Sequence, residues 1–442
     1  MAILDATDRR LLRLAGPAFV TLSAEPIYVL VDTAVVGHLG TTPLGGLAIA
    51  GTVLSTLTWL VMFLATGVTT QVGQRIGAGD SHGARSAVSQ GLVAALAFGL
   101  GLAVLVGTAA RPLARLLGGR SAVLDAGVSY LQVAAFGMPA VALALLALGW
   151  YRGTENLRLP VLVAVASNVA NVALELLFVW VFHWGIRGSA FATVIVQWGA
   201  VLVYGLALKG IIRFQHPQSR ALLALMKIGS ALIVRTAMMV STIAAATWLA
   251  SKSGDSSLGA HQITMQIYLF CALMVDALAV SSQSVFASQM ASRAPGELWP
   301  VTRRLIRLGF IAGGFLAAIL AVGSPFLARA FSDDPAVLHS AKRALLWCTL
   351  MQVSGAVVFV LDGVLMGAGL FPQLAVGAFV AAVAFWAVVA ITRGPVPVRG
   401  LNGVWVALNA WMAVRMVGNY SIARRFLRKT PVIRSGKEFS MS

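Results

Sequence analysis

The chain has 442 residues, of which 59% are hydrophobic and only 11% are charged. This balance excludes an ordinary soluble globular protein and indicates a chain that crosses a membrane many times. The net charge of +18 comes from short Lys and Arg clusters between apolar runs. Because no nucleic-acid-binding motif accompanies them, we expect contact with membrane lipids and no nucleic-acid partner.

A helix needs about 20 apolar residues to cross a bilayer. This length predicts an all-α integral membrane fold with twelve spans, at about 11–37, 45–73, 86–110, 122–148, 158–182, 187–212, 221–250, 258–290, 300–322, 336–366, 371–392 and 400–425. With the N-terminus inside, 21 Lys and Arg lie on the inner side and 10 on the outer side. The positive-inside rule therefore places both termini in the cytoplasm, and we expect a multi-pass protein of the plasma membrane.

The first span carries two acids in an otherwise apolar run. Glu25, Tyr28 and Asp32 are spaced at i, i+3 and i+7, so a helix places all three on one face. Carboxylates at bilayer depth are costly and usually face a polar interior, where they mark a transport pathway or a proton relay. We expect Asp32 to bind a proton, and Glu25 and Tyr28 to line a substrate cavity.

The fifth span repeats this spacing with Asn168, Asn171 and Glu175. The two helices could then face each other with matched polar sides. Two carboxyl groups beside a hydrogen-bonding amide form a plausible proton site, in which Asn168, Asn171 and Glu175 tune Asp32. The alternative is that the two amides only make ordinary hydrogen bonds between helices.

The second half of the chain carries a different set of polar side chains. Arg235 is buried in the seventh span without an acid on the same helix. It should pair with Asp276 or Asp362, either in a substrate cavity or as a fixed ion pair that joins helices. Arg415, near the inner end of the last span, is expected to extend its side chain to the membrane surface. The predicted cavity residues of this half are Arg235, Met239, Gln262, Gln266, Asp276, Gln283 and Asp362. For Met239 and the other methionines of these spans, core packing is the alternative.

The chain resembles itself without gaps at an offset of 214 residues. Leu113-Ala114-Arg115 meets Leu327-Ala328-Arg329, and Gly149 and Gly153 meet Gly363 and Gly367. This match favours duplication of a six-span unit. Because six is an even number, the halves are parallel repeats related by a pseudo-two-fold axis along the membrane normal. The predicted domains are an N-lobe (1–212), a cytoplasmic linker (213–220), a C-lobe (221–425) and a basic cytoplasmic tail (426–442).

The sequence shows no signature of an enzyme or of a metal centre. Cys271 and Cys348 both lie inside predicted spans, so neither a disulfide framework nor a cysteine-based metal site is expected. No metal cluster, Ser/His pair or Gly-rich phosphate loop stands at a span end. We therefore expect a transporter without a cofactor, with an integral-membrane transferase as the remote alternative.

These segments resemble the multidrug and toxic compound extrusion (MATE) family, closest to its DinF-like branch. The residues that carry the resemblance are Pro17, the run Asp32-Thr33-Ala34-Val35-Val36-Gly37-His38, the run Gln74-Arg75-Ile76-Gly77-Ala78-Gly79-Asp80, Arg152-Gly153, Asn171 with Glu175, Arg235-Thr236, Gly259-Ala260-His261-Gln262, Asp276 with Gln283, and Asp362-Gly363. The resemblance covers nearly the whole chain.

The resemblance implies two six-helix lobes and the export of organic, often cationic or amphipathic, compounds in exchange for H⁺ or Na⁺. Asp32 matches the family's first-span aspartate, and Glu175 stands where the family usually has an aspartate. The NorM-like branch carries an acid in its seventh span that has no match here, and Gln283 stands where relatives often have a glutamate. We therefore predict a monomeric, proton-coupled efflux antiporter. A sodium-coupled antiporter and a flippase for lipid-linked substrates are the alternatives.

Overall fold

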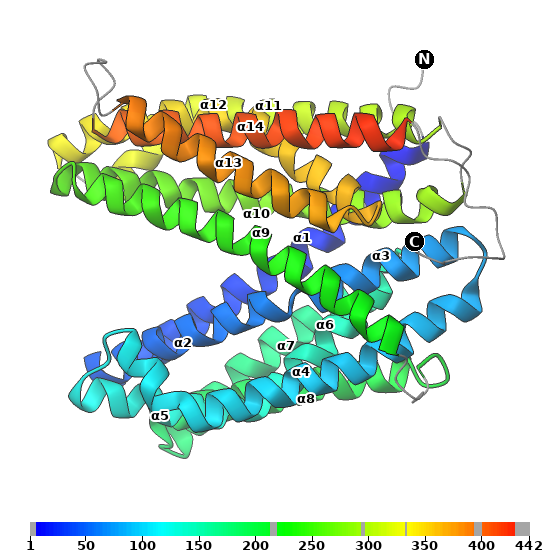
Figure 1. Ribbon diagram of the computed structural model, residues 1–442. Coiled ribbons are helices and arrows are strands. Elements are labelled where there is room, and N and C mark those ends of the chain that lie inside the picture. Colours follow the sequence, from blue (N-terminus) through cyan, green and yellow to red (C-terminus); the bar gives the residue numbers. More distant parts are fainter. Residues whose placement is uncertain (1–5, 213–218, 293–296, 332–333, 393–399, 429–442) are drawn as a thin grey trace. The chain divides into compact units, whose positions relative to one another are not determined.

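The structure is a computed structural model that describes residues 6–212, 219–292, 297–331, 334–392 and 400–428 (Figure 1). Most of the predicted linker 213–220 and of the predicted tail 426–442 lies outside the described residues. The α-helices are α1 (Ala6–Gly37), α2 (Thr41–Val61), α3 (Phe63–Gly77), α4 (Ser81–Leu116), α5 (Ser121–Ala134), α6 (Met138–Gly153), α7 (Arg158–Leu176), α8 (Gly185–Ala207), α9 (Ser219–Ser251), α10 (Asp255–Ser292), α11 (Leu298–Phe331), α12 (Pro335–Gly367), α13 (Phe371–Thr392) and α14 (Leu401–Leu427).

Eleven helical segments of the described residues are long and apolar enough to cross a membrane. One of them consists of α2 and α3, and another consists of α5, the 3-10 turn η1 (Ala135–Gly137) and α6. The twelfth predicted span is α14, which is less apolar because it carries Arg415, Arg424 and Arg425. The prediction of an all-helical membrane fold is confirmed.

The chain forms two compact units. The N-unit is Pro17–Gly229, and the C-unit is Ser230–Ser442 together with Met1–Gly16. The first turns of α1 thus belong to the C-unit. There Asp8 forms an ion pair with Arg307 at 3.4 Å, and the Arg10 guanidinium donates a hydrogen bond to Ser288 Oγ at 3.1 Å.

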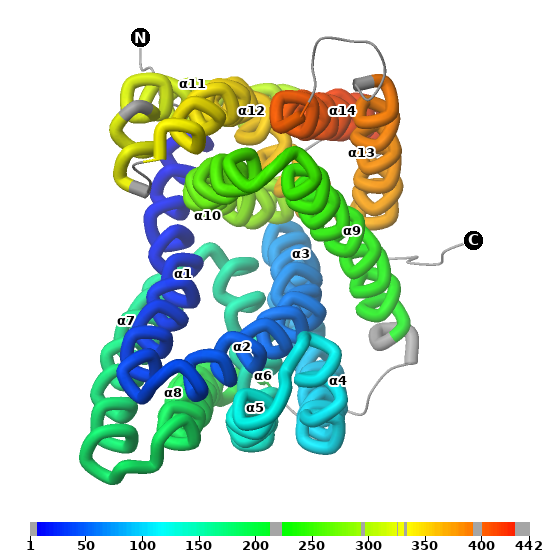
Figure 2. The backbone as a smooth tube through the Cα atoms, turned by 90° about the vertical axis from the view of Figure 1, so that its left-hand side faces the viewer, coloured from blue at the N-terminus to red at the C-terminus, as the bar shows by residue number. Residues whose placement is uncertain are grey.

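In the N-unit, α3 packs against α4 and α6, α2 packs against α5, and α7 packs against α8 (Figure 2). In the C-unit, α12 packs against α10, α11 and α14, and α13 packs against α14 (Figure 1). Trp405, Trp411 and Phe385 are fully buried in the core of this unit. Large apolar side chains such as Leu206 and Phe379 remain exposed, as expected for helices whose outer faces meet lipid tails.

Small residues allow the central helices of both units to approach closely. A Cβ atom at Gly149 of α6 would lie 2.9 Å from the Ala65 carbonyl oxygen and 2.9 Å from Val68 Cβ of α3. A Cβ atom at Gly363 of α12 would meet the Ala279 carbonyl oxygen and Ser282 Cβ of α10.

The next glycine in each unit has the same kind of neighbour. Gly153 faces the Thr69 carbonyl oxygen and Val72 Cβ, and Gly367 faces the Gln283 carbonyl oxygen and Phe286 Cβ. Every one of these contacts in the C-unit stands 214 residues after its counterpart in the N-unit. The sequence repeat therefore corresponds to a repeated helix contact.

Candidate functional site

Asp32 lies at the centre of a polar cluster inside the N-unit and is only 4% exposed. Asn171 Nδ2 donates a hydrogen bond to Asp32 Oδ1 at 3.1 Å, and the Tyr130 hydroxyl donates to Asp32 Oδ2 at 3.3 Å. The Tyr28 hydroxyl donates to Asn171 Oδ1 at 3.1 Å, so it holds the amide with its donor group turned towards Asp32. Both carboxylate oxygens of Asp32 therefore accept a hydrogen bond from a neutral donor.

Glu175 is the second acid of this cluster and is fully buried. It lies close enough to Asp32 and Ser189 to interact with both electrostatically. Neither Glu175 carboxylate oxygen has a hydrogen-bond partner within normal geometry among the described residues. A buried carboxyl group without a matched cation is costly, so this position favours the binding of a proton or of another cation.

Local helix geometry explains why these groups meet. Tyr28 and Asp32 are one turn apart on α1, and Asn171 and Glu175 are one turn apart on α7, so each helix presents its pair on one side. Directly after Glu175, α7 changes into a π turn, η2 (Leu177–Val181). Such turns are rare in helices and are frequent at functional sites.

A cavity of about 840 Å³ lies inside the N-unit. Four of the predicted site residues line it, namely Glu25, Tyr28, Asp32 and Asn168. Further polar groups on its wall are Tyr130, Thr193, Gln197 and Tyr204, and most of the remaining wall is apolar. Among the described residues, those lining the cavity include no Lys, Arg or His.

Asn168 and Glu25 line the cavity but do not join the hydrogen bonds around Asp32. Asn168 Nδ2 donates to the Ala164 carbonyl oxygen at 2.9 Å, within its own helix. Glu25 is exposed on α1, one turn before Tyr28. The structure thus brings together Asp32, Asn171 and Glu175, while Asn168 stands at the cavity wall.

The C-unit holds its buried acid in a different environment. Asp362 of α12 forms ion pairs with Arg235 of α9 and, at 2.7 Å, with Arg415 of α14. Asn419 Nδ2 donates to Asp362 Oδ1 at 2.6 Å. Arg235 therefore has Asp362 as a partner, which was one of the two partners predicted for it. This carboxylate is neutralised twice, so it is unsuited to gain and lose a proton.

The prediction that Arg415 extends to the membrane surface is wrong. Its guanidinium lies against Asp362, 5.0 Å from the Trp411 ring, and the residue is 3% exposed. The physical reason is that a buried acid at hydrogen-bond distance compensates the guanidinium charge, so the side chain gains nothing by reaching for water.

The other predicted cavity residues of the C-unit lie in varied surroundings. Gln262 and Gln266 are exposed, Asp276 is half-buried and Gln283 is buried, all on α10. Met239 is half-buried and packs against the core of the C-unit. The structure brings together Arg235 and Asp362 from this set. A cavity role for these residues stays a prediction.

Sequence reasoning missed Tyr130, Ser189 and Thr193 in the N-unit, and Asn419 in the C-unit. Tyr130 is a single polar side chain in an apolar span, a pattern that does not distinguish a site from an interface. Arg415 and Asn419 were more informative, because they stand at i and i+4 on one face of α14. A polar pair of that kind indicates a face turned towards other helices.

Comparison with known proteins decides the family. The MatE family model matches residues 17–177 and 231–392, one segment in each half of the chain. The chain belongs to the MatE family. It is thus a multi-pass membrane transporter of the multidrug and toxic compound extrusion type.

Curated MATE relatives match over nearly the full chain. DNA damage-inducible protein F of Escherichia coli (strain K12) is 27% identical, with 97% of this chain and 94% of the relative covered. Protein DETOXIFICATION 45, chloroplastic, of Arabidopsis thaliana is 29% identical, with 96% and 79% covered. A probable multidrug resistance protein NorM of Deinococcus radiodurans is 30% identical, with 96% and 95% covered.

Solved structures confirm the MATE fold. A crystal structure of MATE in the bent conformation has a TM-score of 0.88 at 19% identity, with 95% of this chain and 96% of that chain covered. A transporter of the MOP superfamily from Pyrococcus furiosus has a TM-score of 0.82, also at 19% identity, with 95% and 96% covered.

Proposed function

We propose that this MATE transporter exports organic cations or amphipathic compounds in exchange for protons, by alternating access in the plasma membrane. The observation that carries the proposal is the pair Asp32 and Glu175. Two buried carboxyl groups interact there without a basic partner, and Asp32 opens to the cavity of the N-unit.

A shared proton explains how this pair would couple transport. Two adjacent carboxylates in a poorly polarisable environment repel each other, and one proton removes that repulsion. When the proton leaves, the pair attracts another positive charge, so a cationic substrate and H⁺ compete for the same place. Competition of this kind gives exchange, provided that the two ions favour different conformations of the protein.

The cavity supports the proposed substrate class. A volume of about 840 Å³ is within the size range of pockets for drug-sized ligands. Its largely apolar wall suits an organic body, and its two acids, Glu25 and Asp32, suit a positive charge. A flippase for pyrophosphate-linked lipids would need bases at this depth, and the lining residues that the structure describes supply none.

The coupling ion can be tested directly. Inverted vesicles that contain the protein should accumulate a fluorescent organic cation when a pH gradient is imposed. Asp32→Asn should abolish this accumulation, because an amide cannot take up and release the proton. Full activity of Asp32→Asn would contradict the proposal. The control is Asp125→Asn, which removes an exposed acid that pairs with Arg111 on the surface of the N-unit.

A sodium-coupled antiporter is the second candidate, because the cluster offers oxygen donors from Asp32, Glu175 and Asn171. Carboxylate and amide oxygens are ligands that hard cations prefer. In the same vesicles a sodium gradient would then drive accumulation without a pH gradient. We propose proton coupling as the main function, with both termini in the cytoplasm and a monomer as the transporting unit.

A further inference from the structure

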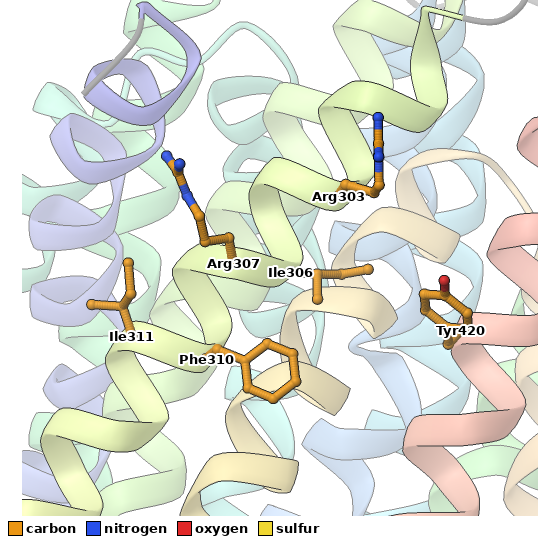
Figure 3. A pocket seen from close by; sticks show the side chains of 6 residues that line it. All are labelled: Arg303, Ile306, Arg307, Phe310, Ile311 and Tyr420. Carbon is orange, nitrogen blue, oxygen red and sulfur yellow. The ribbon is translucent and has the colours of Figure 1, made fainter. Parts of the chain in front are cut away.

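A second pocket lies on the surface of the C-unit, between α11 and α14. It has a volume of about 440 Å³ and is lined by Arg303, Ile306, Arg307, Phe310, Ile311 and Tyr420 (Figure 3). Figure 3 shows both guanidinium groups pointing to the same end of the pocket, with the Tyr420 hydroxyl turned the same way. The Phe310 ring and the Ile311 side chain lie at the other end.

The two arginines stand four residues apart on the exposed side of α11. Like charges at this spacing repel each other and weaken a helix. Arg307 is partly compensated by the buried Asp8, at 3.4 Å, while its own side chain remains 56% exposed. Arg303 is exposed and has no ion-pair partner among the described residues. The polar end of the pocket therefore carries uncompensated positive charge.

The surroundings place this polar end at the level of lipid headgroups. Tyr420 packs edge-on against Trp299, with ring centroids 5.5 Å apart, and Arg428 lies 5.2 Å above the Trp299 ring. Trp and Tyr concentrate where a membrane meets water. Further along α11, Phe310, Ile311 and Phe315 are 47%, 60% and 64% exposed, which provides an apolar track below the arginines.

We propose that this pocket binds an anionic phospholipid. The phosphate group lies between Arg303 and Arg307 with the Tyr420 hydroxyl as a further donor, and an acyl chain follows the apolar track of α11. Charge complementarity carries the assignment, because basic pockets between membrane helices are suited to anionic headgroups. The positive-inside prediction assigns this end of α11 to the cytoplasmic leaflet, where anionic lipid would meet the pocket.

The full chain in detergent can be titrated with phosphatidylglycerol or with phosphatidylcholine of the same acyl chains, and bound lipid counted by native mass spectrometry. One phosphatidylglycerol should bind more tightly than phosphatidylcholine. Arg303→Gln should weaken that binding by about fivefold, which corresponds to one arginine at a lipid headgroup. The matched control is Arg329→Gln, which removes an exposed arginine from the opposite end of α11 and should leave binding unchanged.

Three results would overturn the proposal: equal affinity for the two lipids, equal loss in Arg303→Gln and Arg329→Gln, or displacement of the lipid by soluble glycerol phosphate at the same concentration. The last result would identify an anion site without a role for the acyl chain. Phe310→Ala serves as a second variant and should weaken lipid binding while leaving the two guanidinium groups in place. Arg307→Gln is avoided because it would also remove the partner of Asp8.

Discussion

Asp32 and Asp362 show how its neighbours decide what a buried acid does. Asp32 meets the hydroxyl of Tyr130, the amide of Asn171 and a second acid, so its charge has no fixed counterion. Asp362 lies between two guanidinium groups, which fix it as an anion. We therefore expect the first acid to act in transport and the second to hold α9, α12 and α14 together.

This difference can be tested by stability. Asp362→Asn leaves two buried arginines without their acid, and removing one partner of a buried ion pair typically costs about 3–5 kcal/mol. The variant should lower the unfolding temperature of the purified protein in detergent. Asp32→Asn should leave it unchanged or raised, because it removes a charge that repels Glu175. Equal losses in the two variants would contradict the division of roles.

Tyr130 offers a milder test of the site. Tyr130→Phe removes the hydrogen bond to Asp32 Oδ2 but keeps the ring, so the rate of proton-driven transport should fall by about fivefold, as for one lost hydrogen bond. Its dependence on pH should shift as well, because the hydroxyl interacts with the carboxylate directly. The control is Tyr151→Phe, a buried tyrosine of the same unit whose ring packs against Tyr204. If both variants behave alike, Tyr130 only fills space.

The sequence predicted the acids of the site better than their neighbours. Asp32, Asn171 and Glu175 were found because polar residues at helical spacing inside an apolar span indicate an inward face. Tyr130 and Thr193 carry no such pattern, since each is one hydroxyl among apolar residues. Arg415 was misjudged because its neighbour Asp362 lies 53 positions earlier in the chain, a pairing that requires the packing of α12 on α14.

At the scale of helices, the repeated glycine contacts define the centre of each unit. Gly149 and Gly363 let α6 approach α3 and α12 approach α10 so closely that a side chain would meet backbone atoms of the facing helix. Helices in membranes associate through close packing of small residues, because lipid tails remove the hydrophobic driving force between helices. The repeat at 214 residues preserves this packing while the polar residues around it differ.

Substitution of these glycines should reveal their packing role. Gly149→Ala and Gly363→Ala should each destabilise the protein by about 3 kcal/mol, the upper part of the range for overpacking a core. Gly314→Ala is the matched control, since a Cβ atom there meets nothing within 4 Å. That variant should be neutral or more stable by about 0.5–1 kcal/mol, because alanine favours a helix. Thermal unfolding in detergent measures all three.

At the scale of the whole chain, hydropathy and charge predicted the fold class, the number of crossings and the duplication. Membranes make such predictions effective, because every spanning helix must satisfy its backbone internally and expose apolar side chains to lipid. The breaks within spans were not predictable in the same way. The chain passes from α2 to α3 at Met62 and from α5 to α6 through η1, in stretches without proline signals strong enough to mark them.

The predicted topology can be checked by labelling. Cys271 and Cys348 are both buried, so an added cysteine at an exposed loop end should react alone with a membrane-impermeant maleimide. His82→Cys, in the turn before α4, should react only from the cytoplasmic side. Ser251→Cys, at the end of α9, should react only from the outside. Labelling of both from one side would contradict the assignment of the termini.

The side chains on the cavity wall give the N-unit one further property. Its titratable residues are Glu25, Asp32 and three tyrosines, so the space exerts an electric field of a single sign. A field of this kind, enclosed by weakly polarisable walls, concentrates positively charged molecules before they touch any residue. Capture of a cationic compound should therefore be fast in dilute buffer and slow down as ionic strength rises, whereas capture of a neutral compound of the same shape should be insensitive to salt.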